Sequence, residues 1–212
     1  LYAAGMKPDT ITEIAQRISW SHLVKFGLRR DGLLDASGLE RMIDLLVAKK
    51  AFQDLEIPFA AVSVDIVTGE EVVLDQGPVA PAVRASCAIP GIFLPVRLNR
   101  RLLVDGGIVD NVPARVARQM GADLVIAVDV TYPHRQPRLP KNVLHIIMYS
   151  IDIMQKTQRL QAETFADIII RPDVGDLGFV EIDRWRDFLA AGRWAAEQAI
   201  PRIQELMRER AS

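Results

Sequence analysis

The eight residues from Asp123 to Val130, DLVIAVDV, are apolar at nearly every position rather than at alternate positions. A strand with one face in water alternates polar and apolar side chains, whereas a parallel strand covered by helices on both faces is apolar almost throughout. We therefore expect a buried parallel strand at this point. Predicted helices flank it, at residues 114–120 before the strand and from 143 to about 164 after it.

The rest of the second half continues the alternation of strand and helix. A strand is predicted at residues 166–170, followed by a helical region from 183 to about 210 that we expect Pro201 to interrupt. This order favours an α/β fold of three layers, α/β/α, with a largely parallel central sheet. Because no repeat, linker or low-complexity segment divides the 212 residues, the sequence indicates one domain over residues 1–212.

The first half carries more local signals. Two capping boxes, Thr10 to Glu13 and Ser37 to Glu40, predict the starts of two helices. Two β-rich runs, 59–67 and 71–74, predict a hairpin, and residues 79–88 are expected to be helical.

The chain opens with LYAAGMKP, which is typical of the end of a helix. Gly5 stands where a left-handed residue terminates a helix, and Pro8 follows shortly after. We interpret Leu1 to Ala4 as the last turn of a helix that begins upstream, and we expect the N-terminal portion of the domain to precede Leu1.

Charge and cysteine content exclude several classes of protein. Lys plus Arg number 26 against 27 for Asp plus Glu, so the chain lacks the basic excess of a nucleic-acid-binding protein. Cys87 is the only cysteine, which precludes an internal disulfide and indicates a reducing, cytoplasmic location. No apolar run approaches the roughly 18 to 20 residues of a membrane span, so any membrane contact is expected to be peripheral. No feature indicates an oligomeric state.

The residue list also argues against common cofactors. His22, His134 and His145 are far apart and lack metal-ligand spacing, so no zinc site is predicted, and His145 is expected to be a core residue on an apolar helix face. Neither G-x-G-x-x-G nor G-x-x-x-x-G-K-[ST] occurs, which removes support for a dinucleotide or P-loop site. A divalent cation shared by Asp105 and Asp110 remains a weaker alternative.

The densest chemistry lies in LLVDGGIVDNVP, from Leu102 to Pro113. Asp105 follows the end of an apolar strand and precedes Gly106 and Gly107, which permit backbone angles and close approaches that a side chain forbids. In open α/β sheets, ligands gather at the carboxyl ends of strands, so this placement favours a site. The alternative is a turn aspartate that bonds its own backbone.

Several segments together resemble one family. Residues 84–96, RASCAIPGIFLPV, followed by LVDGG at 103–107 and DNVP at 110–113, look like the second half of a patatin-like phospholipase domain, nearest to bacterial members. LYAAGMKPDTI at the start resembles the helix after that family's nucleophile serine. ADIIIRPDVGDLGF, residues 166–179, resembles its late strand and loop.

The resemblance implies a serine acyl hydrolase that uses a Ser-Asp dyad on a lipid or acyl-ester substrate and needs no metal or cofactor. Asp105 is then the aspartate of the D-G-[AG] motif, supported by Gly106 and Gly107. The G-x-S-x-G elbow and the oxyanion loop do not occur among these residues, so the nucleophile is expected upstream of Leu1, and residues 1–212 alone are expected to be inactive.

None of the seven serines has the glycine spacing of a nucleophile elbow: Ser19, Ser21, Ser37, Ser63, Ser86, Ser150 and Ser212. Ser86 lies inside the matching block, but the resemblance makes that block packing and loop structure. The competing hypothesis is a catalytically silent α/β binding or regulatory module in which Asp105 only holds a turn.

Overall fold

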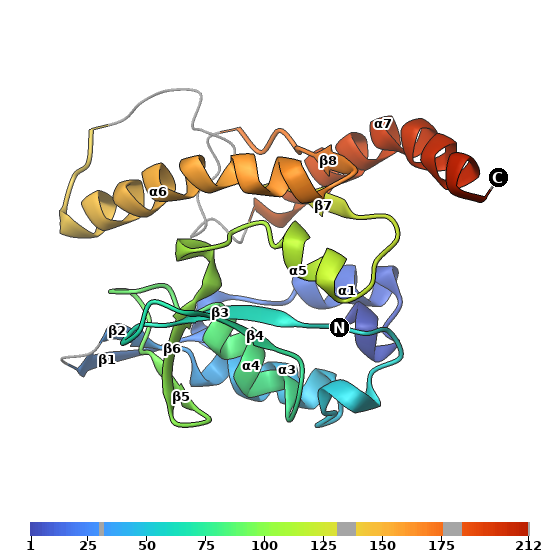
Figure 1. Cartoon of the computed structure of the whole chain (residues 1–212). Coiled ribbons are helices and arrows are strands. Elements are labelled where there is room, and N and C mark those ends of the chain that lie inside the picture. The colour runs from blue at the N-terminus through green and yellow to red at the C-terminus, as the bar shows by residue number, and fades with distance from the viewer. Residues whose placement is uncertain (30–31, 131–138, 176–183, 212) are drawn as a thin grey trace. The chain divides into compact units, whose positions relative to one another are not determined.

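The computed structural model describes residues 1–29, 32–130, 139–175 and 184–211 (Figure 1). The chain divides into two compact units, and each is described by itself. The first comprises Leu1–Asp110 with Val143–Ile147, and the second comprises Asn111–Asn142 with Met148–Ser212. Helices and strands occur in both units, which confirms the α/β class.

The first unit is organised around a four-stranded antiparallel sheet of order β4-β3-β6-β5. Its strands are β3 (Ala61–Asp65), β4 (Glu71–Leu74), β5 (Val96–Leu98) and β6 (Arg101–Asp105). The predicted hairpin is confirmed, because β3 pairs with β4 through the turn at Gly69. Val64, Leu103 and Val104 are almost completely buried, so the core of this unit lies where β3 meets β6.

Helix α4 (Val79–Ser86) packs against β3 and β6, and helix α3 (Ser37–Leu46) packs against α4. Both helices present an apolar stripe to the interior. A further hairpin, β1 (Lys25–Arg29) with β2 (Gly32–Asp35), was not predicted. The remaining elements of this unit are η1 (Tyr2–Ala4), α1 (Pro8–Ala15), α2 (Trp20–Leu23), η2 (Phe52–Asp54) and η3 (Gly106–Ile108).

The capping box at Thr10 was wrong about the residue that starts its helix, whereas the helix start predicted at Ser37 is confirmed. Helix α1 begins at Pro8, which suits a first helical position because its missing N–H would have no helical partner there. Helix α3 begins at Ser37, whose backbone N–H donates to the Asp35 carboxylate at 2.8 Å. Gly5 has φ 94°, as expected of a left-handed terminator, and it ends the short η1.

The second unit contains one parallel strand pair, β7 (Ile126–Val128) with β8 (Ile168–Ile170). Its helices are α5 (Ala114–Gln119), most of α6 (Val143–Phe165) and α7 (Trp185–Ala211). The predictions of a helix from 143 and a strand up to residue 170 are confirmed. The prediction that Pro201 interrupts the last helix was wrong, because α7 continues through Pro201. A long helix tolerates the loss of one backbone N–H donor.

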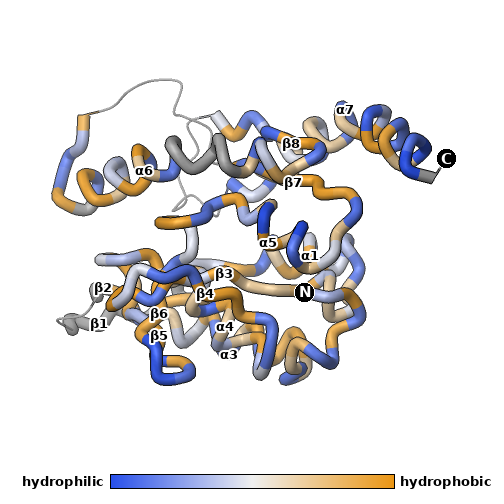
Figure 2. The backbone as a smooth tube through the Cα atoms, viewed as in Figure 1, coloured by the Kyte–Doolittle hydropathy of each residue, from blue (hydrophilic) through white to orange (hydrophobic). Residues whose placement is uncertain are grey.

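A largely parallel central sheet is not confirmed. The larger sheet is antiparallel, and β7 with β8 is the only parallel pair of named strands within the described residues. The exposed fractions are 41% for Ile126 and 54% for Val128, whereas Ala127 between them is buried. The apolar stretch at β7 is visible in Figure 2. A continuous apolar run therefore did not guarantee burial on both faces, and the three-layer arrangement stays a prediction.

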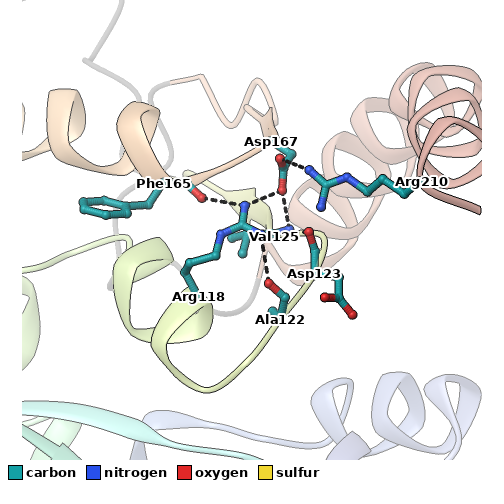
Figure 3. A network of polar contacts seen from close by, with 7 residues as sticks. All are labelled: Arg118, Ala122, Asp123, Val125, Phe165, Asp167 and Arg210. Atoms are coloured by element: carbon teal, nitrogen blue, oxygen red, sulfur yellow. Dashed lines mark hydrogen bonds and ion pairs between the residues drawn. The ribbon is translucent and has the colours of Figure 1, made fainter.

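A polar network holds the second unit together (Figure 3). Asp167, just before β8, accepts hydrogen bonds from the Val125 backbone N–H at 2.7 Å and from Arg118 of α5 at 2.6 Å. Arg210, in the last turn of α7, pairs with the other oxygen of the same carboxylate. The Val125 bond, assisted by the two guanidinium groups, lowers the pKa of Asp167. Arg118 also donates to the carbonyls of Ala122, Asp123 and Phe165.

Asp167→Asn is expected to lower the free energy of unfolding at pH 7 by about 1–2 kcal/mol, because two arginines lose their counter-charge and Val125 keeps a weaker acceptor. Since the folded-state pKa is depressed, this stabilisation is present above about pH 4 and is lost as the pH falls through the folded value. Urea unfolding at several pH values measures it.

Asp123→Asn is the matched control, because Asp123 contributes only its backbone carbonyl to the network. Its effect is expected to stay within about 0.5 kcal/mol. Equal losses in the two variants at pH 7 would contradict the role assigned to the Asp167 carboxylate.

Candidate active site

Asp105 is the last residue of β6, and its side chain lies at the start of η3. Its backbone N–H donates to the Ala88 carbonyl at 3.0 Å, and its Oδ1 accepts from the Gly107 N–H at 2.7 Å. Within the described part of the chain, no donor bonds Oδ2. One oxygen is thus held by the turn, while the other is left to accept a proton or a hydrogen bond.

The Asp105 carboxyl is partly desolvated. Burial raises its pKa above the ordinary value of 3.8, and the hydrogen bond from Gly107 offsets part of that rise. A carboxylate with a raised pKa binds a proton more tightly and is a better general base than an exposed one. The turn bond was anticipated by the alternative interpretation of the motif, but it occupies only one of the two oxygens.

Of the two purposes expected of the motif's glycines, special backbone angles were wrong and close approach is confirmed for Gly106. Neither Gly106 nor Gly107 has a positive φ. Instead, a Cβ added to Gly106 would lie 2.4 Å from the carbonyl oxygen of Val62 in β3. Glycine is therefore required here by the close approach of two backbone segments. The expected placement was also wrong in one respect, because β6 is an antiparallel strand rather than a parallel one.

The segment around Arg84 packs α4 against its neighbours. Arg84 forms ion pairs with Glu40 of α3 at 2.8 Å and with Asp35 at 3.6 Å. The hydroxyl of Ser86 donates to the Val62 carbonyl at 2.7 Å. This use of the Ser86 hydroxyl supports a packing role for the segment.

Cys87, at the end of α4, is an electrostatic neighbour of Asp105. The residue reaches the surface, yet surrounding protein atoms desolvate its thiol. Burial, together with the negative charge of Asp105, raises the pKa of Cys87 to about 11. The thiol is therefore protonated at neutral pH and is a poor nucleophile there.

A family model for patatin-like phospholipases matches residues 1–118, which is more than half of the chain. The chain belongs to the patatin-like phospholipase family. The matched range includes Asp105, Gly106 and Gly107, together with the segment from Arg84 to Val96. Within the matched patatin-like range, Asp105 to Gly107 form the turn after β6, and the segment from Arg84 includes the end of α4.

Similar proteins are found in bacteria and mammals. An uncharacterized NTE family protein of Mycobacterium tuberculosis is 30% identical over an alignment of 233 residues, covering 98% of this chain and 40% of that protein. A second such protein of the same organism is 39% identical over 99 residues, or 47% of this chain and 28% of the relative. Patatin-like phospholipase domain-containing protein 7 of Rattus norvegicus is 35% identical over 100 residues, which are 46% of this chain and 7% of that protein. The chain thus spans less than half the length of these relatives.

The other residues singled out in the sequence lie in different parts of the chain. Asp110 donates its backbone N–H to Gly106 at 2.9 Å, and no cluster of three or more metal-binding side chains occurs in the described ranges. His22 is exposed beside Ser19, His145 is half-buried in α6, and His134 lies outside the described residues. No helix in the described part of the chain is long and apolar enough to cross a membrane.

One residue at the site was not singled out as a site residue. Ser63 lies opposite Asp105 in the β3–β6 ladder and is completely buried. The available signal was a lone hydroxyl within the strand sequence AVSVD, but a serine in a strand is too common to identify a site without the register of its partner.

Gly106→Ala is expected to lower the free energy of unfolding by about 1–3 kcal/mol, because the new methyl group meets the Val62 backbone rather than a movable side chain. Gly192→Ala in α7 is the control: its added Cβ meets nothing within 4 Å, and alanine is expected to stabilise the helix by about 0.5–1 kcal/mol. Thermal unfolding measures both, and a Gly106→Ala protein with an unchanged Tm would disprove the close approach.

Cys87 reports on the charge of Asp105. At pH 8, iodoacetamide is expected to alkylate the folded protein slowly, because thiolate becomes about tenfold scarcer for each unit of raised pKa. Asp105→Asn removes one of the two causes of that rise, so alkylation should become faster. Mass spectrometry of timed samples gives the rates, and a rate that Asp105→Asn leaves unchanged would contradict the electrostatic contact.

Proposed function

We propose that the complete protein is a serine acyl hydrolase of the lipid esterase or phospholipase A type, with Asp105 as its general base. The observation that carries the proposal is the carboxylate itself: it is partly desolvated, it is held through Oδ1 by Gly107, and it stands in the D-G-G motif within the matched range. Family membership and the name of the mammalian relative support lipid substrates.

In the proposed reaction, a serine hydroxyl gives its proton to Asp105 Oδ2 while its oxygen attacks the ester carbonyl. The tetrahedral oxyanion collapses, the alcohol leaves with a proton returned from Asp105, and an acyl-serine remains. Water then attacks the acyl group and loses a proton to Asp105, which passes that proton to the departing serine oxygen as the fatty acid is released. A general base of this kind contributes typically about 100- to 10,000-fold in rate.

The nucleophile is proposed to lie in the sequence that precedes Leu1 in the complete protein, along with the backbone donors for the oxyanion. Residues 1–212 by themselves are therefore proposed to be inactive. The proposed reaction needs no metal and no organic cofactor. Contact with lipid surfaces is proposed to be peripheral.

A catalytically silent binding or regulatory module is the second candidate, and one observation favours it. The bond from Gly107 N–H to Asp105 is what a turn aspartate makes, with or without chemistry at the other oxygen. The two candidates predict different consequences when the charge of Asp105 is removed and its shape is kept.

Asp105→Asn in the complete protein is expected to lower kcat by at least about 100-fold with little change in KM, because an amide cannot accept the serine proton. The amide oxygen can still accept from Gly107, so the Tm should move little. In the unsubstituted protein, burial raises the pKa of Asp105. The decrease of kcat/KM on the acid side is therefore expected at a higher pH than an ordinary carboxyl group would give, with activity lost as the pH falls through the pKa of Asp105.

Hydrolysis of a short-chain p-nitrophenyl ester measures these constants. Asp110→Asn is the control and is expected to retain most activity, because Asp110 is assigned no part in the proton transfer. Wild-type kcat in Asp105→Asn, at an unchanged Tm, would refute the dyad and favour the silent module.

A further inference from the structure

Ser63 occupies the middle of β3 and has no exposed surface. Its Oγ has no hydrogen-bond partner among the described residues. A buried hydroxyl without a partner costs stability, and most such groups in proteins are paired. The hydroxyl of Ser63 is therefore expected to donate a hydrogen bond to an acceptor within reach of its side chain.

The strand register identifies that partner. Ser63 stands directly opposite Asp105 in the antiparallel β3–β6 ladder. Three positions further along β3, the Ile66 N–H donates to the Leu102 carbonyl, so Ile66 and Leu102 are a hydrogen-bonded pair. Hydrogen-bonded and non-hydrogen-bonded pairs alternate along an antiparallel ladder, so Ser63 and Asp105 are a non-hydrogen-bonded pair. Side chains of such a pair share one face, with Cβ atoms roughly 4.5–5.5 Å apart.

The Asp105 backbone is consistent with this arrangement. Its N–H points away from β3 and donates to Ala88. Its Oδ1 is taken by Gly107, and no described donor bonds Oδ2. A buried hydroxyl without an acceptor thus lies on the same sheet face as a carboxylate whose second oxygen has no described donor.

We propose that Ser63 is a positioning residue, whose hydroxyl donates to the ionised Asp105 carboxylate and fixes the orientation of the base. The catalytic part of this proposal rests on the proposed function. While Asp105 is charged, the hydrogen bond holds the carboxylate plane between Gly107 and Ser63. When Asp105 takes up a proton, the hydroxyl loses its charged acceptor and the bond weakens.

Other groups near β6 do not take this role. Asp65, on the same face as Ser63, is an acceptor and is bonded by the Val67 N–H at 3.0 Å. Arg84 is engaged with Glu40. Arg97 of β5 and Arg101 at the start of β6 are exposed.

The test is a direct titration of Asp105 in the complete protein by carbon-13 NMR of its side-chain carboxyl, assigned by its loss in Asp105→Asn. Ser63→Ala removes the donor and is expected to raise the Asp105 midpoint by about half a unit to one unit, because a hydrogen bond to the charged form favours it. Ser86→Ala is the matched control, since its hydroxyl bonds the Val62 carbonyl, and it should leave the midpoint unchanged. An unchanged or lowered midpoint in Ser63→Ala overturns the proposal.

The activity measurement separates this proposal from the function on which it rests. If both hold, Ser63→Ala shifts the acid limb of kcat/KM to higher pH by the same amount as the NMR midpoint. If Asp105→Asn retains full activity, the proposed function fails, while a shifted midpoint would still establish the hydrogen bond. A shifted midpoint with an unmoved acid limb would overturn the catalytic part alone.

Discussion

The pairing of β3 with β6 is the interaction on which the rest of the first unit depends. It brings Val64 and Val104 into the core, and it carries β6 to the point where Asp105 leaves the sheet. The turn that follows presses against β3 so closely that only a hydrogen atom fits on Gly106. The position of the acid is therefore set by backbone packing, which is stiffer than any arrangement of surface side chains.

Patterns that depend on neighbouring residues could be predicted from the sequence. The β3–β4 hairpin, the helix from Val143 and the strand ending at Asp105 each follow from local periodicity and turn residues. The direction of strand pairing could not be predicted, because an apolar run such as that before Asp105 is compatible with either direction. The assumption that β7 is covered on both faces failed for the same reason: covering depends on other parts of the chain.

The candidate site shows the same division. Asp105 was identified by its position between an apolar strand and two glycines, and the family resemblance gave it a chemical role. Two reasons for Gly106 were expected, close approach and a special backbone angle, and only the folded backbone shows that close approach is the one that applies. Ser63 was passed over because its relation to Asp105 exists only across the sheet, some forty residues away in the sequence.

The Val62 peptide group has a consequence for how this region can vary. Its carbonyl oxygen accepts a hydrogen bond from the Ser86 hydroxyl, and the same oxygen leaves no room for a side chain at position 106. Two segments that are distant in the sequence thus converge on one oxygen. The effects of substitutions at positions 86 and 106 are consequently expected to be non-additive, because a change that lets β3 shift also alters which side chains fit in the turn. In homologues, the residues at these two positions should therefore vary together rather than independently.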